Sequence, residues 1–187
     1  MGESEGRSPS GKEDAVPPSR LIAVQAVRTY LEMTDPSQLT GQPEAPPGVT
    51  LAREAACAPD LWRRLYVEVG SEYHWVDRLG WTDDEIRHYL DDVGLELWIL
   101  REAADVAGYF ELRRDADGGI EIAYFGLLAA FTGRGLGRYL LAAAVTRAWE
   151  LGPSRVWVHT SSLDHPSALP NYVARGFTVW KQDIYAV

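Results

Sequence analysis

The chain has 187 residues, 46% of them hydrophobic, which suits one domain with a sizeable core. Its formal net charge of −9 argues against nucleic acid and anionic membranes as partners, because both favour clustered Lys and Arg. No stretch approaches the roughly 20 apolar residues that cross a bilayer. Cys57 is the only cysteine, so no intrachain disulfide can form. We therefore expect a cytoplasmic protein that binds neither nucleic acid nor membrane.

Two segments interrupt the apolar patterning near the N-terminus. Residues 1–20 are rich in Gly, Ser, Pro and charge, and they predict a disordered leader. Residues 41–48 read as a proline-rich loop. We expect residues 21–187 to form a single domain.

The first half of that domain predicts a strand, a second short strand and two helices. Residues 21–33 are apolar and β-branched enough for a strand, and residues 49–53 suit a shorter one. Apolar residues recur at helical spacing over 59–70. The Thr-Asp-Asp-Glu sequence at 82–85 is a capping-box pattern that opens a second helix, ending near Leu90.

Three runs of strand-forming residues follow, at 96–101, 106–113 and 120–128. Only short connections separate them, and one of these contains a Gly-Gly pair. Short connections join antiparallel neighbours, so the three runs predict an antiparallel meander.

A helix, a strand, a short helix and a last strand complete the domain. Apolar residues at helical spacing over 136–151 predict a helix that ends at Gly-Pro. Apolar and polar residues alternate over 155–160, which predicts a strand. A short helix over 168–175 and a last strand over 177–186 follow. The order predicts a mixed α/β fold with a central, mostly antiparallel twisted sheet flanked by helices. One parallel crossover would run over the helix 136–151.

Residues 132–137 read Thr-Gly-Arg-Gly-Leu-Gly and lead directly into that helix. Glycines let a loop bring successive backbone N–H groups against an anion, and the helix N-terminus adds its own free N–H groups and dipole. Arg134 and Arg138 flank this loop. The pattern predicts a phosphate-binding cradle.

The element order and this loop resemble the GNAT superfamily of acyl-CoA-dependent N-acyltransferases over residues 21–187. The family motif is Gln/Arg-x-x-Gly-x-Gly/Ala. Gly135 and Gly137 supply its glycines, whereas Thr132 stands where Gln or Arg is usual. This departure bears on donor affinity more than on reaction type, since in the family the loop backbone does most of the pyrophosphate binding.

A second motif strengthens the resemblance. The family often shows Asn-x-x-Ala-x-x-x-Tyr between its fifth strand and a Gly-Phe pair. Here Ala168 and Tyr172 keep their places before Gly176-Phe177, and His165 replaces the asparagine. Two motifs separated by a plausible helix and strand are harder to obtain by chance than one.

The resemblance implies acetyl-CoA as the acyl donor, with its pyrophosphate on the glycine loop and its pantetheine arm along the end of the preceding strand. The residues expected to bind it are Leu127, Leu128, Ala129, Gly133, Arg134, Gly135, Leu136, Gly137, Arg138 and His165.

An alkylammonium acceptor must lose a proton before it attacks a thioester, so a base is useful. Glu121 is the candidate, because it precedes Thr132 by the interval at which a subset of the family places a catalytic glutamate. Glu111 is the substitute and Asp164 the third candidate. Period-two alternation would place Glu121 on one face with residues 123, 125 and 127, looking along the groove.

Tyr172 stands at the family's position for the general acid that protonates the departing CoA thiolate. The alternative interpretation is an aromatic residue that packs beneath the last helix. No covalent enzyme intermediate is required, so we expect direct transfer in a ternary complex, with catalytic residues Glu121 and Tyr172.

Aromatic and acidic residues cluster in and after the first helix, the segment that forms one wall of the acceptor pocket in the family. Aromatic faces with carboxylates suit a cationic acceptor. The residues expected to bind the acceptor are Tyr66, Trp75, Asp77 and Trp81.

Other chemistries fit less well. His159, Asp164 and His165 make an incomplete metal-ligand set, so we expect no metal. The alternating glycines do not give the Gly-x-Gly-x-x-Gly spacing of a dinucleotide-binding fold. The leading hypothesis is an N-acetyltransferase that acts on the primary amine of a small molecule, and a homodimer is one of the expected partner arrangements. Two alternatives stay open: acetylation of a protein N-terminus or lysine, and a non-catalytic CoA-binding domain.

Overall fold

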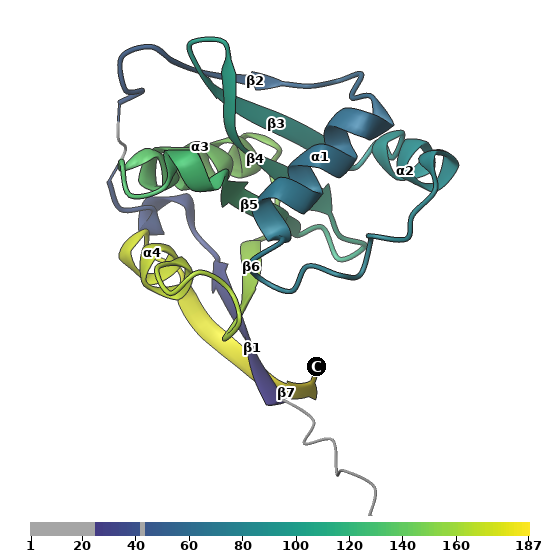
Figure 1. The fold of residues 1–187 in the computed structure, drawn as a ribbon. Coiled ribbons are helices and arrows are strands. Elements are labelled where there is room, and N and C mark those ends of the chain that lie inside the picture. Colours follow the sequence, from purple (N-terminus) through teal and green to yellow (C-terminus); the bar gives the residue numbers. More distant parts are fainter. Residues whose placement is uncertain (1–24, 42–43) are drawn as a thin grey trace, which may run out of the picture.

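Seven strands form one sheet in the computed structural model, which describes residues 25–41 and 44–187 (Figure 1). The expected leader, residues 1–20, lies outside the described residues. The strands are β1 (Gln25–Met33), β2 (Val49–Arg53), β3 (Leu95–Glu102), β4 (Asp105–Arg114), β5 (Ile120–Leu127), β6 (Val156–Ser161) and β7 (Thr178–Ala186). Their spatial order is β2-β3-β4-β5-β6-β1-β7.

The sheet is antiparallel except between β5 and β6, which are joined through helix α3 (Leu136–Glu150). A parallel pair needs such a crossover, because its connection must return to the starting end of the sheet. The predicted mixed α/β fold, its meander β3-β4-β5 and its single parallel crossover are therefore confirmed.

Strand β1 takes a position that its place in the sequence does not predict. It lies between β6 and β7, antiparallel to both, although it is the first element of the described residues. Arg28 is thereby opposite Ser161 on β6 and Asp183 on β7, and Tyr30 is opposite His159. The first and last strands thus complete one end of the sheet together.

Helices cover both faces of the sheet (Figure 1). Helices α1 (Pro59–Gly70) and α2 (Asp83–Leu90) pack with β3 and β4 in one core cluster, around Trp62, Leu65 and Ile86. Helix α3 packs on the other face, where α4 (Ala168–Ala174) contributes Tyr172 to the same core. Short 3₁₀ turns at Pro36–Gln38 and Ala129–Phe131 complete the described elements.

Local sequence signals set the helix boundaries as expected. The Thr82 side chain accepts a hydrogen bond from the Glu85 N–H, and the Glu85 carboxylate accepts one from the Thr82 N–H, which is the predicted capping box. Gly152 follows α3 with φ of +68°, a left-handed conformation that ends helices.

Substitution of Gly176, which joins α4 to β7, tests how much its close contact with Gln38 matters for stability. Its φ is +102°, and a Cβ at this position would overlap the backbone carbonyl of Gln38. We expect Gly176→Ala to reduce the free energy of unfolding by about 3 kcal/mol and Tm by about 10 °C. The control is Gly152→Ala, where φ is also positive, at +68°, but a Cβ would meet open space, and this variant should lose about 1 kcal/mol. Equal losses in thermal unfolding would show that the Gln38 contact is unimportant.

Candidate functional site

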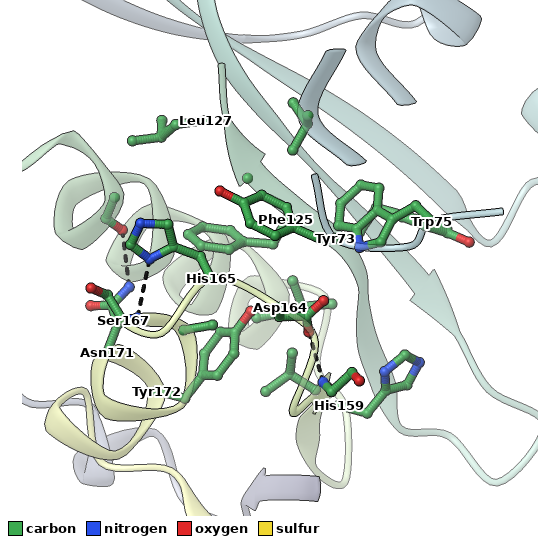
Figure 2. Close-up of a pocket in the computed structure, with 18 of the residues that line it drawn as sticks. Tyr73, Trp75, Phe125, Leu127, His159, Asp164, His165, Ser167, Asn171 and Tyr172 are labelled. Carbon is green, nitrogen blue, oxygen red and sulfur yellow. Dashed lines mark hydrogen bonds between the residues drawn. The ribbon is translucent and has the colours of Figure 1, made fainter. Parts of the chain in front are cut away.

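A cleft of about 640 Å³ opens where β5 and β6 separate. The two strands pair only from Ile120/Val156 to Ile122/Val158, and beyond these residues they diverge without further pairing. The later residues of both strands line the cleft, together with the glycine loop, α4 and the segment after α1. Figure 2 shows Tyr73 beside His165, with Tyr172 pointing from α4 into the same space.

A β-bulge in β5 decides which side chains face which side of this cleft. Glu111 of β4 is opposite Tyr124, but the next residue, Leu112, is opposite Ile122, so Ala123 is the extra residue. The bulge shifts the alternation by one. Consequently, the residues of β5 that pack toward α3 are Ile120, Ile122, Phe125 and Leu127.

The glycine loop presents free backbone donors to the cleft. Gly133 and Gly135 have φ of +72° and +82°, and Gly135 is the N-cap of α3 without a side-chain cap. Within the described residues, the N–H groups of 133–135 donate no hydrogen bond. The first N–H groups of α3 lack helical partners by geometry. The loop therefore has the donors that an anion requires.

Some of the loop residues line the cleft, and others make contacts elsewhere in the protein. Gly133, Gly135, Gly137 and Arg138 line the cleft, as does Thr132, whose hydroxyl donates to the Ala129 carbonyl at 2.9 Å. Other residues predicted to bind the donor are placed differently. Arg134 forms a 2.6 Å ion pair with Glu102, Leu136 is buried in the core, and Leu128 and Ala129 lie outside the cleft lining, whereas Leu127 is part of it.

Helix α4 forms the wall opposite β5. Tyr172 is 4% exposed and lies edge-on to Phe125 and Phe177 at 6.0 Å. Burial, and to a smaller degree the Asp164 carboxylate, raises the pKa of Tyr172, so its hydroxyl stays protonated. His165 also lines the cleft, and its Nδ1 accepts a hydrogen bond from the Ser167 N–H at 3.1 Å.

The two predicted glutamate bases do not line the cleft. Because of the bulge, Glu121 lies on the opposite face from Phe125 and Leu127, so the expected shared face is wrong. Glu121 is 3% exposed, and its carboxylate forms a 2.5 Å ion pair with Arg113. Burial raises the pKa of Glu121, and Arg113 opposes that effect. Glu111 is completely buried.

His159 is the cleft residue beside Glu121. It lies on β6, its side chain is 38% exposed, and its Nε2 is 3.7 Å from Glu121 Oε1. Burial lowers the pKa of His159 and the nearby Arg28 and Arg113 cations lower it further, whereas the Asp164 carboxylate opposes them without reversing the shift. Its imidazole is therefore neutral at neutral pH and can accept a proton. The sequence pattern indicated His159 only as part of an incomplete metal-ligand set and not as a proton acceptor.

Three of the four residues predicted to bind the acceptor line the cleft, and one does not. Tyr66, Trp75 and Asp77 line the cleft, and Tyr66 and Trp75 both contact the ring of Tyr124. Trp81 instead stacks on Trp62 outside the cleft lining.

An arginine of the chain itself occupies the aromatic cluster around Trp81. The Arg78 guanidinium lies 4.1 Å from the ring centre of Tyr89, 4.5 Å from Tyr124 and 4.6 Å from Trp81. Arg78 is also 3.8 Å from the buried Glu111. These aromatic faces hold an internal cation, so they are not free to bind a cationic acceptor.

No cluster of three or more metal-ligating side chains occurs among residues 25–41 and 44–187. In the same part of the chain, no helix is long and apolar enough to span a membrane.

Substitution of Glu111 tests whether the carboxylate beside Arg78 is buried at a cost in stability. Its carboxylate accepts hydrogen bonds from Trp62 Nε1 at 2.7 Å and from the Tyr89 hydroxyl, and burial raises its pKa. Ionising it therefore costs stability as pH rises above about 4.3, its value in an unfolded chain. We expect the Tm of Glu111→Gln minus that of the wild type to increase between pH 4.5 and 8.

The control is Glu72→Gln, the same substitution at an exposed residue without an ion pair in the described part of the chain, measured over the same pH range. A Glu111→Gln difference that decreases with pH would mean that Arg78 keeps the carboxylate ionised in the folded protein.

Comparisons with known proteins agree with the fold and the loop. A model of the acetyltransferase (GNAT) family matches residues 58–177. No curated protein matches the sequence.

Solved structures show the same fold at low sequence identity. A GCN5-related N-acetyltransferase from Kribbella flavida is 20% identical with a TM-score of 0.62, over 86% of this chain and 57% of that one. One from Sphaerobacter thermophilus is 19% identical with a TM-score of 0.62, over 88% and 52%. An IAA acetyltransferase from Bacillus cereus is 20% identical with a TM-score of 0.52, over 71% and 79%.

The chain spans little more than half the length of the first two of these proteins. The family match nevertheless covers well over half of this chain and includes both the glycine loop and α4. The chain therefore belongs to the GNAT family of acetyltransferases.

Proposed function

We propose that this chain transfers the acetyl group of acetyl-CoA to the primary amine of a small molecule, by direct attack in a ternary complex. The observation that carries the proposal is the meeting of three features in one cleft. These are the unbonded N–H groups of the glycine loop, the unpaired stretch of β5 and a neutral histidine.

The cleft suits acetyl-CoA as a substrate. The pyrophosphate is an anion that matches the free N–H groups of residues 133–135, the N-terminus of α3 and Arg138. The pantetheine arm carries amides that can pair with an exposed strand edge, and β5 offers such an edge beyond Ile122. Both features direct the thioester toward the point where β5 and β6 begin to diverge.

His159 is the group that we propose to accept the amine proton. It faces the cleft from β6, on the sheet face opposite α3, and its lowered pKa leaves it neutral. We assign Glu121 a positioning role rather than direct contact, because it lies behind His159 and is held by Arg113. A carboxylate beside an imidazole fixes ring orientation and stabilises the imidazolium that forms.

Tyr172 is the proposed donor to the leaving group. The amine nitrogen attacks the thioester carbonyl, its C–N bond forms, and the C–S bond breaks as the tetrahedral intermediate collapses. The departing thiolate takes a proton, for which the protonated Tyr172 hydroxyl is placed in the cleft. The proton taken from the amine balances this one, so the products are the N-acetylated amine and free CoA.

The chain offers little support for an acyl-cysteine intermediate. Cys57, its only cysteine, lies outside the cleft lining, and burial raises the pKa of its thiol to about 12. A protonated thiol is a poor nucleophile. Direct transfer in a ternary complex needs no such group.

Gly135→Asp tests the donor site. The substitution puts a strained side chain at φ of +82° and a carboxylate against the phosphate-binding N–H groups. We expect calorimetric titration with acetyl-CoA to show saturable binding in the wild type and at least a 100-fold weaker affinity in the variant. The control is Gly118→Asp, which places the same side chain at φ of +84° in a turn outside the cleft. Equal acetyl-CoA affinity in both variants would remove the loop from donor binding.

His159→Gln tests the proton acceptor. General-base catalysis contributes about 10²- to 10⁴-fold, so we expect kcat at pH 7 to fall by about 100-fold, with a smaller loss at high pH, where more of the amine is already neutral. Glu121→Gln should lower kcat by about tenfold without changing KM, and it should have no further effect in the His159→Gln background, since it acts through that residue.

The control for this series is His88→Gln on α2, outside the cleft. Additive losses in the double variant would contradict a shared role, and an unchanged pH-rate profile would remove His159 from the chemistry. Activity on peptides but not on free amines would select a protein as acceptor. Donor binding without transfer to any acceptor would select a non-catalytic CoA-binding domain.

A further inference from the structure

Arg28 is a cleft residue that the proposed chemistry does not use. It extends from β1 into the cleft lining, and its guanidinium lies 4.7 Å from the ring centre of Tyr185. Within the described residues, no carboxylate lies within 4 Å of it. Its nearest acidic neighbour in the sheet register is Asp183, which pairs instead with Lys181 at 2.8 Å. The cleft thus contains a half-buried cation that forms no ion pair within 4 Å among the described residues, although the Asp183 carboxylate is close enough for the Arg28 charge to lower its pKa.

Arg28 lies on the sheet face where we expect the acceptor to bind, opposite the face where we expect the donor. Register places Arg28 opposite Ser161 and Tyr30 opposite His159, so Arg28 and His159 lie on the same sheet face. The donor loop and α3 pack on the other face. The positive charge of Arg28 also lowers the pKa of His159, which agrees with their proximity. A molecule that presents its amine to His159 would therefore extend toward Arg28.

The neighbours of Arg28 hold it in place for binding an anion. The Tyr185 hydroxyl shares a 2.8 Å hydrogen bond with Ser161 Oγ, which fixes the ring under the guanidinium. A stacked guanidinium keeps its planar fork of N–H donors available, and that fork matches the two oxygens of a carboxylate.

We propose that the acceptor is an amine that also carries a carboxylate, such as an amino acid, and that Arg28 binds this carboxylate and sets acceptor specificity. This inference rests on the proposed acetyl transfer for its substrate, but it concerns a separate contact. The amine would lie toward His159, and the carboxylate would lie over Tyr185.

The test uses matched acceptors that differ only in the carboxylate: the common amino acids with their carboxamides, and β-alanine and γ-aminobutyrate with alkylamines of equal length. We expect the wild type to acetylate at least one acid with kcat/KM tenfold or more above its neutral counterpart. Arg28→Gln should reduce kcat/KM for that acid by 10- to 100-fold and leave the neutral counterpart within threefold. Arg28→Lys should retain part of the preference, since a single ammonium replaces the fork.

The control is Arg64→Gln, an exposed arginine of α1 outside the cleft lining. Acetylation without an acid preference, or a preference that survives in Arg28→Gln, would overturn the inference while the proposed function stands. An increased KM for acetyl-CoA in Arg28→Gln would assign Arg28 to the donor and would also overturn it.

Binding without turnover separates the two proposals. Thermal shifts of the CoA-loaded protein with each acid and its neutral counterpart should show acid-selective stabilisation that Arg28→Gln abolishes. If that selectivity appears but no acid is acetylated, the carboxylate site stands and the transferase proposal fails. If neither acetylation nor acid-selective binding is detected, the carboxylate site is contradicted.

Discussion

The short parallel pairing between β5 and β6 is the constraint on which the site depends. Three residue pairs, ending at Ile122/Val158, hold the strands together, and the bulge at Ala123 bends β5 immediately afterwards. Beyond that point the β5 edge is unpaired, and the space between the strands becomes the cleft. A longer parallel ladder would satisfy the strand edges and leave no room for a substrate.

The same bulge gives the two faces of the sheet different side chains near the cleft. On the α3 side it places Phe125 and Leu127 near the glycine loop, where an anionic donor fits. On the other side lie the ionisable groups Glu121, His159 and Arg28. Further along that face, Arg78 and Glu111 form a buried pair among aromatic rings. Arg78 lies against the ring of Tyr124, which lines the cleft, whereas Arg28 lines the cleft itself.

Much of the fold could be predicted from local signals, whereas much of the site depends on long-range pairing. The capping box at Thr82 and the glycine that ends α3 gave the helix boundaries closely, and Gly135 and Tyr172 lie in the cleft. The orientation of Glu121 could not be predicted, since the bulge depends on how β4 pairs with β5. The roles that we propose for His159 and Arg28 could not be predicted either, because β1 reaches its place beside β6 only in the folded sheet.

The central claim is that acetyl-CoA occupies the opening between β5 and β6 with its pyrophosphate on the glycine loop. Hydrogen exchange of the backbone amides, measured with and without saturating acetyl-CoA, tests this claim most directly. We predict slower exchange in two separate segments, 133–137 and 123–127, because the ligand would supply acceptors to those N–H groups of each segment that have no partner in the free protein. Protection that is absent from both segments, or confined to another part of the molecule, would contradict the account.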